Sequence, residues 1–360
     1  MRHLHLLWAT LLLATPSLGG TQFLFGVDSS FANEMDDCGA IYRDNGKQQD
    51  VYEIYKAHDV NFVRLRLWVH PRWTKYSTLK DVKRSIARAK ALHIGVLLDL
   101  HYSDDWADGD KQIIPDAWSS IPDDEGLAKT VYEYTQNVLA ELRRDRLLPE
   151  MIQIGNETNG ELMMSAPTKA AIRWSRNAKL LNAGIKAVRD SNPTIKIMLH
   201  IAQPENVALW LSDAAKAGVT DFDVIGISYY RKWSKLDLAG LGDTIGRLHK
   251  TYPKTDIMVV ETAYPWTGRN ADHAPNVLGD DSLLAGYPAT VMGQQAYLKD
   301  IAATIAANGG AGLFYWAPDW LSTKCATRWG QGSNWDNAAL FDFEGNALPS
   351  FDFQRPPNPW

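Results

Sequence analysis

Short apolar runs recur along the chain, and each is followed by a longer stretch in which apolar residues are spaced three or four apart. Two of the runs, Val96-Leu97-Leu98 and Ile257-Met258-Val259-Val260, contain no polar residue. Unbroken runs are typical of parallel strands that are buried on both faces. Such runs predict eight strands, at residues 23–27, 61–69, 95–100, 151–155, 196–200, 224–229, 257–261 and 312–316.

The segments between these runs have helical periodicity. Val131, Tyr134, Val138 and Leu142 lie on one face of a helix, and residues 172–188 and 294–307 repeat the pattern. A strand followed by a helix, repeated eight times, predicts an α/β fold that is a single (β/α)8 TIM barrel. The alternative is a doubly wound open sheet. That fold is expected to carry a glycine-rich phosphate loop after its first strand, and residues 26–30 (GVDSS) do not form one.

The N-terminus resembles a targeting segment. Arg2 is followed by a leucine-rich run from Leu6 to Ala14 and then by Pro16, Ser17, Leu18 and Gly19. This order predicts a signal peptide over residues 1–20, a barrel domain over residues 21–360, and a secreted or periplasmic protein. The alternative is an uncleaved anchor, but the run is too short to span a bilayer. We therefore expect no association with a membrane after the signal is removed.

Composition narrows the range of partners. Lys and Arg number 37 against 42 Asp and Glu, so the formal net charge is −5 and the chain lacks the basic character of a nucleic-acid-binding protein. The chain has 14 Trp, 14 Tyr and 10 Phe. Exposed Trp in a cleft suits a sugar-binding protein, because the apolar face of a sugar stacks on a flat ring. The alternative use of these residues is a core rich in Trp.

The chain has two cysteines, Cys38 and Cys325, and no metal-type cysteine spacing. Cys38 follows the first predicted strand and Cys325 follows the eighth, and these strands are neighbours in a closed barrel. The two loops can therefore meet, and export from the cell would allow a disulfide between them. The alternative is two separate free thiols.

Polar and aromatic side chains gather where the predicted strands end. The carboxyl ends of the strands form the active-site rim in barrels of this kind, and polar groups there cost stability unless they are hydrogen-bonded. Their accumulation at this rim indicates a site. Its members are Arg64, Arg66, Trp68, Asp99, His101, Asn156, Glu157, His200, Ser228, Tyr229, Tyr230, Glu261 and Trp316.

Two carboxylates of this rim, Glu157 and Glu261, directly follow the fourth and seventh apolar runs. Those strands lie on opposite sides of a barrel mouth, so the two side chains can face each other across it. Glycoside cleavage needs such a pair, one to protonate the departing oxygen and one to attack the anomeric carbon. The alternatives are that each Glu is a solvated loop charge, or that Thr158 and Thr262 beside them are helix caps.

The motifs around these residues resemble those of the endo-β-1,4-galactanases, glycoside hydrolase family 53. The resemblance runs from about residue 23 to residue 350, and it rests on the combination of motifs rather than on any one of them. The matching segments are residues 63–69 (VRLRLWV), 99–104 (DLHYSD), 106–108 (WAD), 155–158 (GNET), 226–230 (GISYY), 261–264 (ETAY), 313–316 (LFYW), 333–337 (SNWDN) and 339–342 (ALFD).

The resemblance implies a retaining endo-glycosidase that hydrolyses internal β-1,4 linkages of galactan or of type I arabinogalactan in plant cell-wall pectin. Glu157 would be its general acid/base and Glu261 its nucleophile. Arg64 and Tyr230 would hold Glu261 as an oriented carboxylate, and the rivals for those two positions are Arg66 and Tyr229. No cofactor is needed for this chemistry.

The resemblance also implies sugar-binding roles for six further residues. Asn156 would bind the sugar 2-hydroxyl, and His101 and Trp316 would line the subsite of the cleaved sugar. Trp106, Asp108 and Lys111 would reach neighbouring sugars. Because Trp106 and Trp316 come from different walls of the barrel, we expect their ring planes to be well separated and inclined to each other.

Departures from the family pattern lie in outer loops and bear on the choice of substrate more than on the chemistry. They are Gly109, Arg231-Lys232 and Ala317. β-Mannanase or xylanase activity on a related barrel therefore remains an alternative, as does a carbohydrate-binding barrel without catalysis. Asp272, His273 and Asn276 resemble a compressed form of a structural calcium loop seen in some family members, or are a plain polar loop. We expect a monomer.

Overall fold

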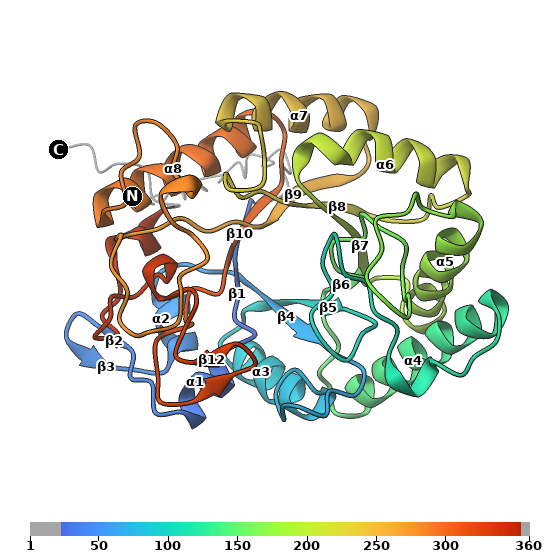
Figure 1. Ribbon diagram of the computed structural model, residues 1–360, viewed down its shortest axis with the longest axis horizontal. Coiled ribbons are helices and arrows are strands. Elements are labelled where there is room, and N and C mark those ends of the chain that lie inside the picture. The colour runs from blue at the N-terminus through green and yellow to red at the C-terminus, as the bar shows by residue number, and fades with distance from the viewer. Residues whose placement is uncertain (1–22, 354–360) are drawn as a thin grey trace, which may run out of the picture.

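The computed structural model describes residues 23–353, and its centre is a closed barrel of eight parallel strands (Figure 1). The strand order around the barrel is β1-β10-β9-β8-β7-β6-β5-β4, so the first and last barrel strands are neighbours. The predicted (β/α)8 TIM barrel is confirmed. The predicted signal peptide, residues 1–20, lies outside the described residues.

All eight predicted strands are present, with ends that differ from the prediction by at most two residues. The barrel strands are β1 (Leu24–Asp28), β4 (Phe62–Leu67), β5 (Gly95–Leu100), β6 (Met151–Ile154), β7 (Lys196–Ala202), β8 (Val224–Ser228), β9 (Asp256–Glu261) and β10 (Gly312–Trp316). Two short hairpins outside the barrel were not predicted. They are β2 (Arg43–Asp44) with β3 (Lys47–Gln48), and β11 (Ala326–Thr327) with β12 (Gly330–Gln331).

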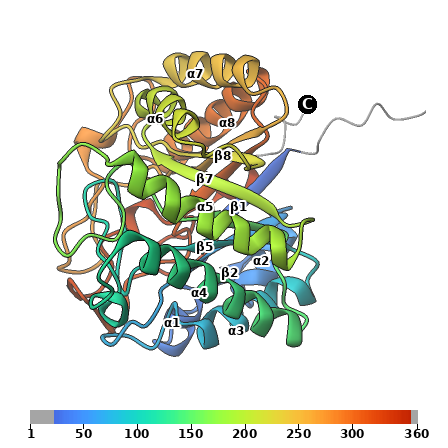
Figure 2. The ribbon, with the colours of Figure 1, turned by 90° about the vertical axis from the view of Figure 1, so that its right-hand side faces the viewer.

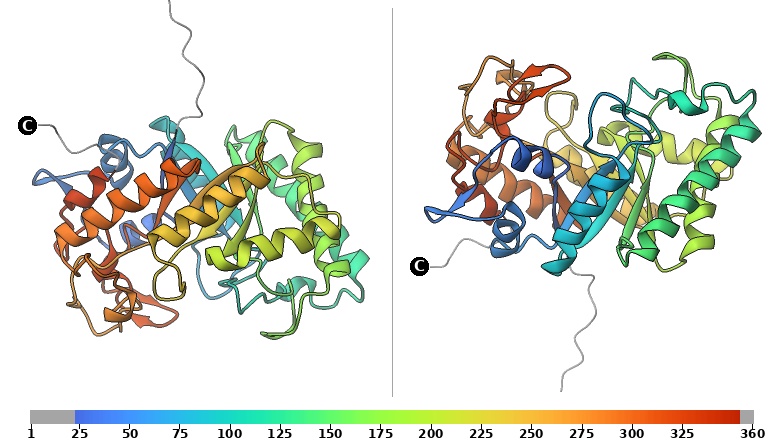
Figure 3. Two further views of the ribbon diagram at one scale, coloured as in Figure 1. Left: turned by 90° about the horizontal axis from the view of Figure 1, so that it is seen from above. Right: turned by 90° about the horizontal axis from the view of Figure 1, so that it is seen from below.

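Helices surround the barrel, with α7 and α8 along one side and α3 and α4 along the opposite side (Figure 3). Viewed from the side, α4 and α5 lie in front of the strands (Figure 2). The helices are α1 (Ala32–Asp37), α2 (Val51–Ala57), α3 (Leu79–Ala91), α4 (Asp124–Arg144), α5 (Trp174–Ser191), α6 (Pro204–Lys216), α7 (Leu238–Thr251) and α8 (Val291–Ala307). Within residues 23–353, no helix is both long and apolar enough to cross a bilayer.

Local sequence explains where many of these helices begin. The N-cap side chains of α2, α3, α4, α7 and α8 each accept a hydrogen bond from a backbone N–H of the first turn; these caps are Asp50, Thr78, Asp123, Asp237 and Thr290.

The expected helix after the eighth strand is absent. The described residues that follow β10 form the β11–β12 hairpin and two short 3-10 turns, η3 (Asp336–Ala338) and η4 (Pro349–Asp352). This segment lacks helical periodicity, yet Leu340, Phe341 and Phe351 from it are fully buried in the main core. It therefore packs against the barrel as an irregular layer in place of a helix.

The barrel interior has an apolar layer below and a polar layer above. Seven side chains from six of the strands fill the lower layer, namely Leu97, Met151, Met198, Val224, Met258, Val260 and Phe314. Gly26 is required there, because a Cβ at this position would lie 2.2 Å from the Phe314 ring. The next inward positions towards the C-terminal ends are polar, and they form the floor of the site described below.

A disulfide joins Cys38, directly after α1, to Cys325, directly before β11, with their Cα atoms 5.7 Å apart. The predicted bridge is therefore present, and it holds the β11–β12 hairpin beside α1 (Figure 1). The hairpin reaches the barrel mouth, where the Arg328 guanidinium pairs with the carboxylate of Asp105.

Candidate active site

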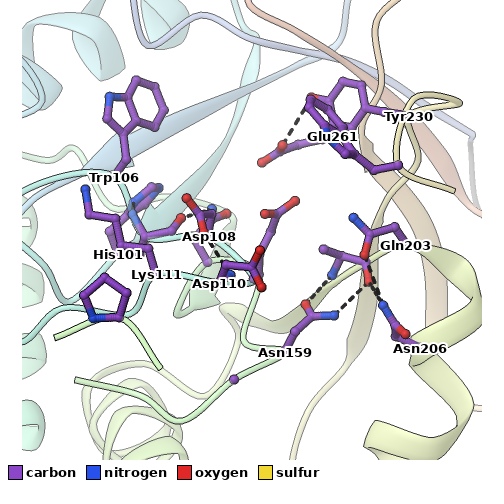
Figure 4. Close-up of a pocket in the computed structure, with 18 of the residues that line it drawn as sticks. His101, Trp106, Asp108, Asp110, Lys111, Asn159, Gln203, Asn206, Tyr230 and Glu261 are labelled. Atoms are coloured by element: carbon purple, nitrogen blue, oxygen red, sulfur yellow. Dashed lines mark hydrogen bonds between the residues drawn. The ribbon is translucent and has the colours of Figure 1, made fainter. Parts of the chain in front are cut away.

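A cleft of about 1460 Å³ opens at the carboxyl ends of the barrel strands. The sequence prediction proposed ten catalytic and sugar-binding residues, and all ten line this cleft. They are Arg64, His101, Trp106, Asp108, Lys111, Asn156, Glu157, Tyr230, Glu261 and Trp316. In the close-up, Glu261 and Tyr230 lie on one side, across the cleft from Trp106, His101 and Lys111 (Figure 4).

Glu261, the last residue of β9, is held by two donors. Arg64 Nη1 lies 2.7 Å from its Oε1 atom, and the Tyr230 hydroxyl donates to its Oε2 atom at 3.2 Å. The rivals contact other groups: Tyr229 donates its hydroxyl hydrogen to the backbone oxygen of Leu236, and the Arg66 guanidinium stacks on a tryptophan. Both donors favour the charged form of Glu261.

A β-bulge places Glu261 at the mouth. The register between β8 and β9 shifts at Ile227/Ser228, so that Ser228 pairs with Glu261 rather than with Val260. Val260 fills the apolar layer of the barrel interior, and the residue directly after it still reaches the cleft. Bulges commonly re-aim a side chain beside an active site in this way.

Arg64 is the centre of the polar layer. Its guanidinium also contacts carboxylate oxygens of Asp28 at 2.7 Å and Asp99 at 2.8 Å. It donates from Nε to Gln153 Oε1 and from Nη2 to Asn156 Oδ1. Arg64 is fully buried, so these contacts replace its hydration. The planar fork of arginine suits such a set of acceptors, which lysine could not serve together.

Glu157 faces the same cleft from the loop after β6. Its backbone φ of 43° lies in the left-handed region, which is uncommon for a residue other than glycine and often marks a functional position. Ser228 Oγ lies 2.6 Å from its Oε1 atom. Burial raises the pKa of Glu157, and Asp108 adds to that rise, while the Ser228 hydrogen bond and Arg64 oppose it.

Glu261 is also shifted by its surroundings. Burial raises the pKa of Glu261, the charge of Arg64 opposes the rise, and the negative charge of Glu157 adds to it. Two carboxyl groups that interact in this way share their protons as a pair. Within residues 23–353, Glu261 has a guanidinium partner at hydrogen-bonding distance and Glu157 has none. The arrangement can thus keep a proton on Glu157 while Glu261 is ionised.

The expectation that Trp106 and Trp316 are well separated is wrong. Their ring centroids are 5.9 Å apart, although the planes are inclined by 56° as expected. The loop after β5 folds inward because Arg66 stacks on the Trp106 ring, with its guanidinium carbon 3.8 Å from the ring centroid. Trp106 also lies 5.7 Å from Trp329 of the hairpin. The aromatic residues form one continuous wall rather than two isolated platforms.

Three other predicted residues have protein partners at the cleft wall. His101 Nε2 lies 2.9 Å from an Asp99 oxygen. Asn156 donates from Nδ2 to the backbone oxygen of Ala107, and Lys111 pairs with Asp105 at 2.7 Å. These contacts fix each side chain at the wall of the cleft.

The loop considered for calcium, residues 272–276, makes hydrogen bonds to the segment after β10 and within itself. The Asp272 oxygens accept hydrogen bonds from Ser322 Oγ and from the backbone N–H groups of Ala274 and Ser333. Asn276 donates to the backbone oxygen of Arg269. In the part of the chain that the structure describes, no group of three or more His, Cys, Asp or Glu side chains could hold a metal ion. Hydrogen bonds from Ser322 and Ser333 thus tie this polar loop to the segment after β10.

Four buried residues of the polar layer received no role from the sequence. Gln153 and Asp28 form hydrogen bonds with Arg64. Ser228 forms a hydrogen bond with Glu157, and His200 forms one with Ser228. Gln153 carried a signal, since it is the polar residue in the apolar strand β6. Aromatic residues of the cleft wall were missed as well, among them Trp320, whose ring stacks on the buried Phe31 ring with centroids 4.1 Å apart.

The sequence is similar to a known protein family and to named curated proteins. Residues 24–354 match the family model described as glycosyl hydrolase family 53. The chain is 47% identical to an arabinogalactan endo-β-1,4-galactanase of Cellvibrio japonicus over 96% of this chain and 94% of that protein. It is 32% identical to an endo-β-1,4-galactanase of Bacillus subtilis over 91% of this chain and 84% of that protein.

Solved structures agree with the sequence comparison. The family 53 catalytic domain from Ignisphaera aggregans superposes with a TM-score of 0.87 at 36% identity, covering 94% of this chain and 97% of that one. A fungal β-1,4-galactanase superposes with a TM-score of 0.79 at 31% identity, covering 92% and 99%. With the fold, the paired carboxylates and these relatives together, the chain belongs to glycosyl hydrolase family 53.

Proposed function

We propose that this protein is a retaining endo-β-1,4-galactanase, with Glu157 as its general acid/base and Glu261 as its nucleophile. One observation carries the proposal: two carboxyl groups line one cleft, and in the described part of the chain a guanidinium holds one of them, at 2.7 Å, and not the other. The carboxyl group beside the guanidinium can stay ionised and act as the nucleophile, whereas the other can keep its proton and act as the acid. The names of the relatives from Cellvibrio japonicus and Bacillus subtilis supply the substrate.

In the first step, Glu261 attacks the anomeric carbon while Glu157 gives its proton to the departing glycosidic oxygen. Burial favours the protonated acid, because it raises the pKa of Glu157. Arg64 and Tyr230 keep the attacking oxygens of Glu261 charged and aimed. Burial raises the pKa of the Tyr230 hydroxyl too, so it remains a donor.

In the second step, Glu157 is a carboxylate and takes a proton from a water that attacks the glycosyl–Glu261 ester. The sugar is released with its anomeric configuration retained. Asn156, which lines the cleft directly before Glu157 in the sequence, would bind the sugar 2-hydroxyl. His101 and Trp316 would line the cleaved sugar, and Trp106, Asp108 and Lys111 would contact its neighbours.

The natural substrate would be galactan or type I arabinogalactan of plant cell-wall pectin. Residues 1–20 would act as a signal peptide that directs residues 21–360 out of the cell, which agrees with the disulfide between Cys38 and Cys325. N-terminal sequencing of the exported protein should begin near residue 20. The secreted domain is expected to act as a monomer.

A substrate panel tests the proposed activity. The mature protein is incubated with unbranched β-1,4-galactan, arabinogalactan, linear mannan and xylan, and the released oligosaccharides are analysed. We expect oligosaccharides from the two galactans. Faster cleavage of mannan or xylan would assign the barrel to one of the alternative activities, and binding without cleavage would indicate a sugar-binding barrel.

Glutamine variants test the two roles. Glu157→Gln and Glu261→Gln should each lower kcat on galactan by about 10³-fold or more, because each removes a group that acts in the transition state. On an aryl galactobioside with a good leaving group, the first step no longer needs a proton. Glu157→Gln should therefore lose much less of that first step than Glu261→Gln. Equal losses on both substrates would contradict the acid role.

A further inference from the structure

Behind Glu157 lies a chain of two buried side chains that the mechanism above does not use. Ser228 Oγ, at the end of β8, lies 2.6 Å from Glu157 Oε1. His200 Nε2, on β7, lies 2.8 Å from Ser228 Oγ. Ser228 and His200 are 1% and 0% exposed, so water cannot substitute for either contact.

The direction of donation along these two hydrogen bonds depends on which ring nitrogen of His200 carries the hydrogen. A serine hydroxyl has one hydrogen, so Ser228 can donate to Glu157 or to His200, but not to both. If His200 carries its hydrogen on Nε2, it donates to Ser228, and Ser228 must then donate to Glu157. If His200 carries its hydrogen on Nδ1, Ser228 donates to Nε2, and its oxygen is left to accept from a protonated Glu157.

The surroundings of His200 Nδ1 favour the first arrangement. The backbone N–H of Glu157 donates to Nδ1 at 3.4 Å, and it makes no other hydrogen bond within residues 23–353. Gln153 Nε2 also lies 3.1 Å from Nδ1, but its two hydrogens have nearer acceptors in Asp99 Oδ1 at 2.6 Å and the backbone oxygen of Gly155 at 2.9 Å. An occupied lone pair on Nδ1 satisfies a buried backbone donor that would otherwise be unpaired.

One contact points the other way, since Asn156 Oδ1 lies 2.9 Å from Nδ1 and could accept a hydrogen from it. That oxygen already accepts a charge-assisted hydrogen bond from Arg64 Nη2 at 2.6 Å. If Nδ1 donated to it, the backbone N–H of Glu157 would lose its acceptor. His200 is also neutral, because burial and the charge of Arg64 lower its pKa. The hydrogen of the neutral ring therefore belongs on Nε2.

We propose that His200 and Ser228 are positioning residues that direct the transferable proton of Glu157 to its Oε2 atom. His200 donates from Nε2 to Ser228, and Ser228 gives its one hydrogen to Oε1, so the proton meant for the leaving oxygen resides on Oε2. In the second step the same donation holds Oε1, so that Oε2 is the oxygen of the Glu157 carboxylate that takes the proton from water. This inference rests on the acid/base role proposed above.

The charges around Glu157 define what removal of the chain should do. Asp108 faces it from the loop after β5 and Arg64 from β4; Glu261 on β9 and Tyr230 after β8 also interact with it. None of these groups changes when Ser228 is shortened. Burial raises the pKa of Glu157, and the Ser228 hydrogen bond lowers it. Loss of this hydrogen bond should therefore raise the pKa of Glu157 further.

The kinetic test compares Ser228→Ala with the natural enzyme. The alkaline limb of kcat/KM on galactan should move to higher pH by about one unit, the size expected when a carboxylate loses one hydrogen bond. On an activated aryl galactobioside, kcat should fall about tenfold, because the base oxygen is no longer held in place and the step in which water attacks becomes limiting. His200→Ala should reproduce both effects, whereas His200→Gln, which keeps an N–H near the Nε2 position, should restore the pH profile.

The control is Ser85→Ala. Ser85 is another buried serine, but it lies on α3 and accepts a hydrogen bond from Asn33, so both readouts should stay unchanged. An alkaline limb that does not move in Ser228→Ala, or that moves equally in Ser85→Ala, would overturn the proposal.

A spectroscopic test does not depend on activity. ¹⁵N NMR of His200 in the natural enzyme should show a neutral ring protonated on Nε2, and a ring protonated on Nδ1 would overturn the proposal. ¹³C NMR should give Glu157 a higher pKa in Ser228→Ala than in the natural enzyme. If the natural enzyme fails to cleave galactan, the proposed function falls, while these two spectra still decide the direction of the hydrogen-bond chain.

Discussion

Arg64 is the residue on which the chemistry and the stability of the barrel mouth depend together. It contacts the nucleophile candidate Glu261 and two further carboxylates, Asp28 and Asp99. Arg64→Lys keeps the charge but cannot serve all three, so kcat should fall about 10²-fold or more. The unpaired buried carboxylates should also cost about 3 kcal/mol of unfolding free energy. Steady-state kinetics and urea unfolding measure the two effects.

Arg66→Lys is the matched comparison. Arg66 lies on the same strand, but its guanidinium stacks on Trp106 and donates to Ser77. The change should raise KM more than it lowers kcat, because it disturbs the aromatic wall rather than Glu261. A larger loss of kcat in Arg66→Lys than in Arg64→Lys would contradict the assignment of Arg64.

Asp319 is a buried carboxyl outside the cleft mechanism. Burial raises its pKa to about 7, opposed by a hydrogen bond from Ser29. Because an unfolded Asp has a pKa of about 3.9, the folded state holds this proton more tightly. Its stabilising contribution is complete below about pH 4 and is lost as the pH rises through about 7.

Asp319→Asn removes that titration. The unfolding free energy of the variant should gain about 2 kcal/mol relative to the natural protein between pH 5 and pH 8. Denaturant unfolding at the two pH values measures it. The control is Asp221→Asn, whose side chain is 62% exposed and should show no such trend. A relative gain on acidification would contradict the sign.

At the residue scale, the sequence predicted which ionisable side chains reach the cleft, but it did not predict which residues contact them. Glu261 could be predicted because it follows an apolar run, and Arg64 because it alternates with apolar residues in its strand and the family resemblance implied its role. Asp28 could not be assigned, since its importance comes from its 2.7 Å contact with Arg64, 36 residues away in sequence. Such pairings are set by the closure of the barrel and not by local pattern.

At the scale of elements, the barrel strands were predictable because each is a short apolar run with a clear boundary. The helix expected after β10 was not found, because residues there bury Phe341 and Phe351 without helical spacing. The β-bulge before Glu261 was also beyond prediction. A run of apolar residues gives no sign of where the register between neighbouring strands will shift.

The β11–β12 hairpin gives a prediction at this scale. The bridge from Cys38 to Cys325 spans 287 residues of sequence, so it restricts the unfolded chain strongly. Replacing both cysteines with alanine should cost about 2–5 kcal/mol of unfolding free energy. It should also raise KM for long galactan chains, because the hairpin carries Trp329 beside Trp106.

Arg328→Gln separates the two effects. It removes the ion pair between the hairpin and Asp105 while the disulfide remains. We expect a higher KM with little change in the thermal midpoint. An unchanged midpoint in the double cysteine variant would show that the bridge does not stabilise the fold.

At the scale of the whole molecule, the fold brings ten predicted residues from distant segments into one cleft. Their meeting was predictable, because all barrel strands end at one rim. The close packing of the aromatic wall was not, since Trp106 and Trp316 were expected to stand apart and their centroids are 5.9 Å apart. The way loops pack over a barrel mouth depends on long-range contacts, which the spacing of apolar residues does not predict.

The central claim is that Glu261 forms a covalent bond with the cleaved sugar while Glu157 handles the proton. Incubation with an activated 2-deoxy-2-fluoro galactobioside, followed by peptide mass spectrometry, tests it directly, because fluorine slows hydrolysis of the intermediate. The account predicts one labelled peptide with the sugar on Glu261, formed in the natural enzyme and absent from Glu261→Gln. Label on Glu157, or inversion of the product anomer without any label, would contradict it.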